Sequence, residues 1–170
     1  MLNPKTGERT PFTVAIITSG NEGNYACAAI NHSDDSGIER TACTKHENLL
    51  DAVMNCAKIA LVANITGNGL AVNLVTDSDY LVEMFGGKYR AMVNAGEEID
   101  HKEIWAEIDQ HLRGHKCKLV CAKLGDMTEV AARAKATAEY YAPTAGLWTA
   151  VKPTKKRQPR KKAAAEAEVA

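Results

Sequence analysis

The first part of the chain alternates short apolar runs with turn-forming residues. Two such runs are residues 12–18 and 25–30, residues 37–44 form a more polar third segment, and glycine, asparagine, serine and aspartate are frequent between them. Short apolar runs bounded by such residues are typical of β-strands. Because the connections are short, we expect these three strands to pair as an antiparallel meander.

The period of the pattern changes in the next segment. Between residues 46 and 63, apolar residues recur at steps of three and four, which is typical of an amphipathic helix. They are Leu49, Leu50, Val53, Cys56, Ala57, Ala60 and Leu61. Residues 70–75 are apolar on both faces, which predicts a buried central strand. A short helix is expected from Tyr80 to about Gly86, followed by a polar stretch up to Glu98.

The last part of the chain again alternates a helix, a strand and a helix. Residues 100–112 have a second amphipathic pattern, with Trp105 on its buried side, and Gly114 is a helix stop. Residues 117–123 predict a fifth strand, and residues 127–141 predict an alanine-rich helix. The order β-β-β-α-β-α-β-α predicts an α/β fold. We expect a mixed five-stranded sheet with helices on both faces, in which the first, fourth and fifth strands are parallel.

The composition is that of one globular domain. The chain has 170 residues, of which 45% are hydrophobic, 25% charged and only 5% aromatic, so the core should be mostly aliphatic. No apolar run approaches the roughly 20 residues that span a bilayer, and no secretory signal begins the chain, so we expect a cytoplasmic protein. The five cysteines include no Cys-x-x-Cys pair, which predicts reduced, structural thiols.

The charge is distributed unevenly along the chain. We expect a loose leader over residues 1–10, a folded domain over residues 11–145 and a disordered tail over residues 146–170. With 14 basic and 19 acidic residues, residues 1–151 carry a net charge of −5. The tail contains seven bases close together: Lys152, Lys155, Lys156, Arg157, Arg160, Lys161 and Lys162. Such a cluster suits nucleic-acid phosphates; a tail that only increases solubility is the alternative.

One acidic cluster follows the central strand. Thr76, Asp77, Ser78 and Asp79 come directly after the apolar run, at its carboxyl end. Ligands of open α/β sheets bind at the carboxyl ends of strands, so Asp77 is the carboxylate that we place in a site. The alternative is a helix cap, because aspartate and serine side chains accept hydrogen bonds from the first backbone N–H groups of a helix.

Several short motifs resemble, in order, those of the type 1 ribonuclease H family. Thr76-Asp77-Ser78-x-Tyr80 matches the family's Thr-Asp-Ser-x-Tyr motif, and Thr18-Ser19-Gly20 stands where the family has Thr-Asp-Gly. Residues 44–52 lie where the family opens its first helix with Thr-Asn-Asn-x-x-Glu-Leu-x-Ala. Glu103-Ile104-Trp105 is similar to its Asp-Leu-Trp, and residues 122–125 stand in for Val-Lys-Gly-His. The likeness covers about residues 12–138 and implies a ribonuclease-H-like fold that acts on RNA–DNA hybrids.

The resemblance also implies a magnesium centre, which this sequence retains only in part. The family uses four carboxylates around two magnesium ions. By position, these carboxylates correspond here to Ser19, Leu49, Asp77 and either Ala131 or Ala132. The loop histidine of the family has no counterpart in residues 124–126. Only Asp77 is left as a metal ligand, which predicts a catalytic site that has decayed. No cofactor is then required, and magnesium is expected only if catalysis survives.

Neighbouring acids offer an alternative to decay. Asp79, Asp126 and Glu129 could rebuild a magnesium site together with Asp77, whereas Glu47 points to another side of its predicted helix.

Candidate nucleic-acid contacts come from two parts of the chain. Lys45 and His46 lie near the positions of the family's substrate-contacting asparagines, and the tail supplies further bases. The tail candidates are Lys155, Lys156, Arg157, Arg160, Lys161 and Lys162.

The histidines do not form a clear metal motif in the sequence. His111 and His115 are four residues apart, but Gly114 should end the helix between them. No metal site is therefore expected there.

Three functions are compatible with these features. The first is a ribonuclease-H-like domain that binds RNA–DNA hybrid or duplex through phosphates and has lost catalysis. The second is an active magnesium-dependent hybrid ribonuclease with rearranged carboxylates. The third is a protein-binding scaffold without a nucleic-acid role, which the acidic charge of residues 1–151 favours.

Overall fold

The computed structural model describes residues 12–33, 36–125 and 128–141. It opens with the predicted meander of β1 (Phe12–Asn21), β2 (Asn24–Ser33) and β3 (Glu39–His46). Both neighbouring pairs are antiparallel, with Thr18 opposite Cys27 in the first pair. β1 and β2 are longer than the apolar runs that predict them, because polar residues at their ends continue the ladder of backbone hydrogen bonds, whereas β3 has the predicted length and begins two residues later.

The rest of the sheet is parallel. α1 (Leu49–Lys58) and the π-helical turn η1 (Ile59–Ala63) connect β3 to β4 (Ala71–Thr76), which lies beside β1 in parallel. β5 (Lys118–Lys123) then pairs in parallel with β4. The strand order is β3-β2-β1-β4-β5, which confirms the predicted mixed five-stranded sheet.

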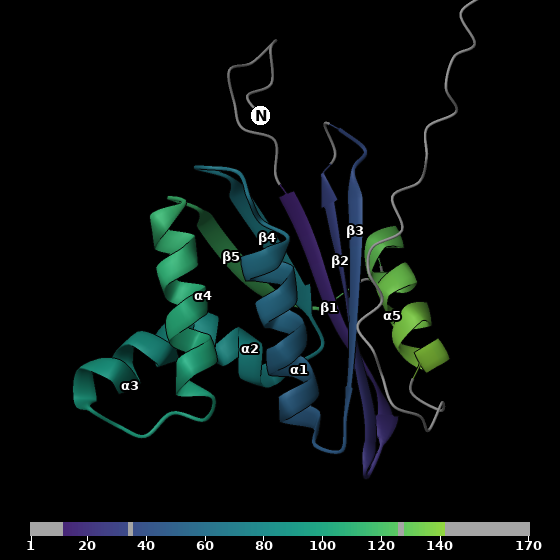
Figure 1. Cartoon of the computed structure of the whole chain (residues 1–170), viewed down its shortest axis with the longest axis horizontal. Helices are drawn as coiled ribbons and strands as arrows, with labels where there is room; N and C mark the ends of the chain where they lie inside the picture. Colours follow the sequence, from purple (N-terminus) through teal and green to yellow (C-terminus); the bar gives the residue numbers. More distant parts are fainter. Residues whose placement is uncertain (1–11, 34–35, 126–127, 142–170) are drawn as a thin grey trace, which may run out of the picture.

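Helices cover both faces of the sheet, as predicted (Figure 1). α1 and α4 (Lys102–Gly114) lie on one face with the short α2 (Asp79–Glu83), whereas α5 (Glu129–Tyr141) lies on the other. The sequence predicts a short helix to about Gly86 and then only a polar stretch up to Glu98, but most of that stretch is also helical. η2 (Met84–Lys88) and α3 (Tyr89–Ala95) continue the chain as helix, with Gly87 at φ 120° absorbing a kink. α3 has no buried residue, so no apolar period marks it in the sequence.

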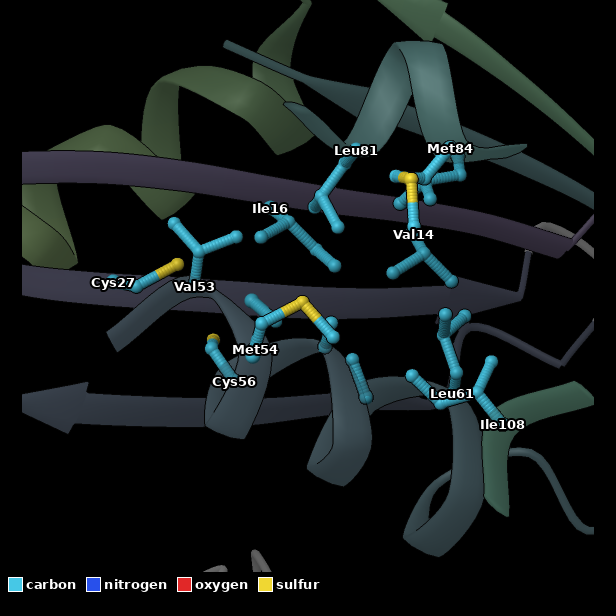
Figure 2. Close-up of a cluster of buried hydrophobic side chains, with 14 of the residues drawn as sticks. Val14, Ile16, Cys27, Val53, Met54, Cys56, Leu61, Leu81, Met84 and Ile108 are labelled. Carbon is cyan, nitrogen blue, oxygen red and sulfur yellow. The ribbon is translucent and has the colours of Figure 1, made fainter. Parts of the chain in front are cut away.

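A large core fills the space between the sheet and α1, α2 and α4. Figure 2 shows Ile16 of β1 beside Val53 and Met54 of α1, with Leu81 of α2 approaching from the other side. Trp105 of α4 is 1% exposed, as predicted, and its ring packs against the rings of Tyr80, Phe85 and Tyr89. This core fixes how α1 and α2, which flank the predicted site, lie on the sheet.

The core under α5 is smaller and consists mainly of alanine and isoleucine. Ala131 and Ala134 of α5 are buried against Ala15, Ile17 and Ile30 of the first two strands. Methyl side chains let the helix approach the sheet closely, which explains why an alanine-rich segment of low amphipathicity is held there.

Some expectations concern residues outside the described ranges. The leader over residues 1–10 and the tail over residues 146–170 lie there, so both remain predictions. All five cysteines are free thiols, in agreement with the prediction. None of the helices in the part that the structure describes has the length and apolar character needed to cross a membrane.

Candidate functional site

The predicted site forms where two neighbouring parallel strands end. β1 and β4 run side by side, so Thr18 near the end of β1 lies next to Asp77, directly after β4. The backbone N–H of Thr18 donates to both carboxylate oxygens of Asp77, at 3.1 Å to Oδ1 and 3.0 Å to Oδ2. The Thr18 hydroxyl donates to Oδ2 at 2.8 Å. Asp77 therefore binds the neighbouring strand through three hydrogen bonds.

The helix cap that was the alternative role for Asp77 belongs to its neighbour. Ser78 is the N-cap of α2, and its Oγ accepts a hydrogen bond from the Leu81 N–H at 3.4 Å. The Ser78 N–H in turn donates to Thr76 Oγ1 at 3.1 Å. The residues of the Thr-Asp-Ser motif thus have different roles. Thr76 and Ser78 stabilise the strand-to-helix turn, and Asp77 connects this turn to β1 through hydrogen bonds.

The charge of Asp77 affects one buried thiol, that of Cys27. Burial raises the pKa of Cys27 well above its ordinary value, and a hydrogen bond with Cys56 and the negative charge of Asp77 raise it further. Burial also raises the pKa of Cys43 on β3 to about 12. The Cys27 thiol beside Thr18 is therefore neutral and poorly solvated, and such surroundings favour the direct hydrogen bonds that Asp77 makes.

Ser19 occupies the position of the family's first carboxylate. Successive strand residues point to opposite faces, so Ser19 lies on the α5 face with Ile17, whereas Thr18 lies on the face that Asp77 contacts. The next residue, Gly20, has φ 119°, and a Cβ there would lie 2.2 Å from the carbonyl oxygen of Asn24. The tight β1–β2 hairpin therefore fixes this end of β1.

The other two family positions hold apolar side chains. Leu49 is the first residue of α1 and is 42% exposed. Asn48 caps that helix, since its Oδ1 accepts from the Leu50 N–H at 2.7 Å. Ala131 is buried in the small core under α5, and Ala132 is exposed. Neither leucine nor alanine can ligate a metal ion.

The candidate substitutes are held in other interactions. Asp79 Oδ1 lies 2.5 Å from Lys123 Nζ, and Glu129 Oε1 lies 2.5 Å from Arg133 Nη1. Arg133 also pairs with Glu39 of β3, so Glu129 belongs to an ion-pair network at the start of α5. Asp126 lies outside the described residues.

These donors do not fit a two-magnesium centre. Two hard cations need several carboxylate oxygens around a shared space. Within residues 12–33, 36–125 and 128–141, no group of three or more histidine, cysteine, aspartate or glutamate side chains could hold a metal ion. Asp77 is the one carboxylate at a family position there, and three hydrogen bonds already engage its oxygens.

Lys45 lies on the same face of the sheet as Ser19. The strand register places Ser19, Ala26 and Lys45 in one row across three strands, so Lys45 is about 10 Å from Ser19. Its Nζ is buried and has no hydrogen-bond partner in the described part of the chain. His46 is half-buried opposite Tyr25 at the end of β3. The basic residues of the tail lie outside the described ranges.

Sequence reasoning did not identify Thr18 as the partner of Asp77. The signal was present, because a hydroxyl residue at the end of β1 is adjacent to the end of β4 once the two strands are paired in parallel. The pairing was predicted, but the motif drew attention to the position after Thr18 instead. The distances show that Thr18 is the residue that contacts the carboxylate.

Comparisons with known proteins agree on the fold. No protein-family model and no curated protein matches the sequence. LC9-RNase H1, a type 1 ribonuclease H with the type 2 active-site motif, matches with a TM-score of 0.60 and 15% identity, over 79% of this chain and 72% of that one. RNase H1 from the halophilic archaeon Halobacterium salinarum matches with a TM-score of 0.52 and 12% identity, over 75% and 93% of the two chains.

A third solved structure is LC11-RNase H1 in complex with an RNA/DNA hybrid. It matches with a TM-score of 0.53 and 18% identity, over 76% of this chain and 96% of that one. At identities this low the likeness shows the fold and not the activity. The fold of this chain is ribonuclease-H-like, as the order of its motifs predicts.

Proposed function

We propose that this domain is a nucleic-acid-binding module with a ribonuclease-H-like fold that has lost hybrid cleavage. The observation that carries the proposal is that Asp77 is hydrogen-bonded within the fold and has no partner carboxylate at the other family positions. It is the single retained carboxylate of the family set, and three hydrogen bonds from Thr18 tie its oxygens to β1. Ser19, Leu49 and Ala131 offer no carboxylate beside it, so the family positions supply too few oxygen ligands for the two ions that cleavage needs.

Two features support a nucleic-acid ligand. A solved structure of the same fold holds an RNA/DNA hybrid, and the tail of this chain carries seven bases within residues 152–162. Lys45 adds a cation near the expected site, since its buried Nζ lacks a hydrogen-bond partner in the described part of the chain. A buried ammonium without an acceptor is unfavourable, and a phosphate oxygen reached by this long side chain would supply the acceptor. We expect recognition through phosphates and not through base edges.

The catalytic part is tested by incubating the full chain with a labelled RNA–DNA hybrid, in magnesium and then in manganese. We expect no cleavage above that of a buffer control. Metal-dependent cleavage that Asp77→Asn abolishes would establish the alternative, an active ribonuclease. In that case Asp79→Asn, Asp126→Asn and Glu129→Gln would identify which acid replaces the missing ligands.

The binding part is tested by titrating duplex and hybrid at several salt concentrations. If all seven tail bases engage phosphates, the log–log slope of affinity against salt should reach roughly −6 on duplex DNA. Removing residues 151–170 should weaken binding strongly and flatten this slope, because the remainder carries a net charge of −5. Unchanged binding after truncation would move the interface to the domain, where Lys45→Gln is the next variant.

Absence of any binding to duplex, hybrid or single strands would leave the third possibility, a protein-binding scaffold. The cytoplasmic location remains a prediction for the same protein. It can be checked by fractionating cells that express the full chain.

A further inference from the structure

A second polar cluster lies at the opposite end of β4. His111 in the last turn of α4 and His115 directly after it have ring centres 4.3 Å apart. Both are half-buried and line an open pocket of about 440 Å³ together with Val62, Glu107, Gln110 and Gly114. The expectation that Gly114 separates the two histidines is wrong, because α4 runs through Gly114 and the His115 N–H still donates to the His111 carbonyl at 3.0 Å.

Each ring is held by one hydrogen bond to the loop before β4. His111 Nε2 lies 2.7 Å from the carbonyl oxygen of Ile65, and His115 Nδ1 lies 2.9 Å from Asn68 Oδ1. Oxygens of this kind accept hydrogen bonds, so both of these ring nitrogens carry a hydrogen. In neutral imidazoles the lone pairs are then left on His111 Nδ1 and His115 Nε2. Neither atom has a hydrogen-bond partner in the part of the chain that the structure describes.

This is the arrangement that metal-binding histidines have. Ligating imidazoles typically donate their second N–H to a carbonyl or carboxylate, which fixes the ring orientation and the tautomer. Residues four apart at the end of a helix lie on the same side, and the carboxyl end of a helix stabilises positive charge. Imidazole nitrogen suits zinc, nickel and copper, whereas magnesium prefers oxygen.

We propose that His111 Nδ1 and His115 Nε2 bind one divalent transition-metal ion, with water completing its coordination. Two protein ligands are the full set, because no third histidine, cysteine, aspartate or glutamate of the described residues is placed to join them. Glu107 lines the same pocket but is paired with Lys58 Nζ at 2.6 Å. Because only two protein side chains bind the ion and the pocket is open to solvent, the ion should exchange readily. It is independent of the proposed nucleic-acid function, since it lies at the other end of β4 from Asp77.

The test is isothermal titration of the full chain with nickel or zinc at pH 7.5. We expect one ion per chain, and magnesium should not compete for it. His115→Gln should weaken binding at least tenfold, and the double variant His111→Gln/His115→Gln should abolish it. His46→Gln is the matched control among the remaining histidines, and its affinity should equal that of the natural chain.

Two further variants keep the result unambiguous. Cys117→Ser tests whether a thiol contributes, because Cys117 Sγ lies 3.8 Å from the His115 carbonyl oxygen; its affinity should not change. His115→Gln leaves the His111 bond to Ile65 intact, so it should keep the circular dichroism spectrum of the natural chain even if the double variant does not fold. No uptake by the natural chain at millimolar metal, or full uptake by a folded His115→Gln, would overturn the proposal.

Discussion

β4 has a polar cluster at each of its ends, and the two clusters use their polar atoms differently. At the carboxyl end, both oxygens of Asp77 accept hydrogen bonds from Thr18, so the carboxylate is engaged within the fold. At the amino end, His111 and His115 each use one ring nitrogen for a hydrogen bond to the loop before β4, and the other ring nitrogen has no such bond in the described residues. A residue in a recognised motif can therefore be structural, while residues outside every motif retain the capacity to bind.

The largest expected effect comes from breaking the hairpin that supports the Asp77 end. Gly20→Ala would place a methyl group 2.2 Å from the Asn24 carbonyl at a backbone angle of φ 119°. A backbone strain of this kind costs about 1–3 kcal/mol, and the steric overlap adds to it. We expect Gly20→Ala to lower the free energy of unfolding by at least about 2 kcal/mol in urea denaturation.

The matched control is Gly23→Ala in the same hairpin. Gly23 also has a positive φ of 75°, but a Cβ there would contact nothing within 4 Å. It should therefore cost clearly less than Gly20→Ala. Equal losses in the two variants would mean that the close approach to Asn24 does not hold the end of β1.

The next largest effect tests whether Asp77 is structural. Asp77→Asn removes the charge from three hydrogen bonds, two of which share the Thr18 N–H; the net contribution of a hydrogen bond to a charged group is about 1.5–3 kcal/mol. Because asparagine still accepts at one oxygen, we expect a loss of about 1–3 kcal/mol in the free energy of unfolding. Asp79→Asn is the control, since its exposed pair with Lys123 should contribute no more than about 1 kcal/mol.

This outcome distinguishes the two roles of the carboxylate. A carboxylate kept for metal binding would repel its neighbours in the metal-free protein, and its removal would leave stability unchanged or increase it. Stabilisation by Asp77→Asn would therefore contradict the comparison between the two ends of β4.

Most of the fold could be predicted from the sequence because the core follows simple periods. The alternating strands, the amphipathic α1 and α4 and the buried Trp105 are all recovered at nearly their observed positions. α3 was missed because none of its own residues is fully buried, although Tyr89 packs on Trp105, and its apolar period is therefore weak. Helix α5 was found from its alanine content, although its face toward Ile17 could be assigned only from the structure.

The polar sites were less predictable, since hydrogen-bond partners depend on pairings between distant segments. Asp77 and Thr18 are 59 residues apart, and His115 and Asn68 are 47 residues apart. The motif that resembles ribonuclease H drew attention to Asp77 but not to its hydrogen-bond partner Thr18. The histidine pair was set aside on the evidence of one glycine, which in the structure remains helical.

A smaller effect is expected at alkaline pH, and it comes from the cysteines of β2 and β3. Burial raises the pKa of Cys43 to about 12 from an ordinary value of 9.0, and it also raises the pKa of Cys27. Below about pH 9 these thiols are protonated in both the folded and the unfolded state. As the pH rises from 9 toward 12, the unfolded chain loses these protons first, so the free energy of unfolding should fall.

Urea denaturation between pH 7.5 and 10.5 would measure this decline. Cys43→Ser replaces a titrating thiol by a hydroxyl that stays neutral, so the variant should lose less stability over the same range. Parallel curves for the two proteins would show that the Cys43 thiol does not contribute to the decline.

The smallest effect concerns the amino end of β4. If His111 and His115 are oriented by the fold but not required for it, His115→Gln should change the free energy of unfolding in metal-free buffer by less than about 1 kcal/mol, because its single bond to Asn68 is exposed. Added metal should produce a difference in stability between the natural chain and His115→Gln. A ligand at 100 times its dissociation constant stabilises the folded state by about 2.7 kcal/mol, so nickel should raise the urea midpoint of the natural chain and leave that of His115→Gln in place. A large loss of stability in metal-free His115→Gln would instead show that this histidine, like Asp77, is needed for the stability of the fold.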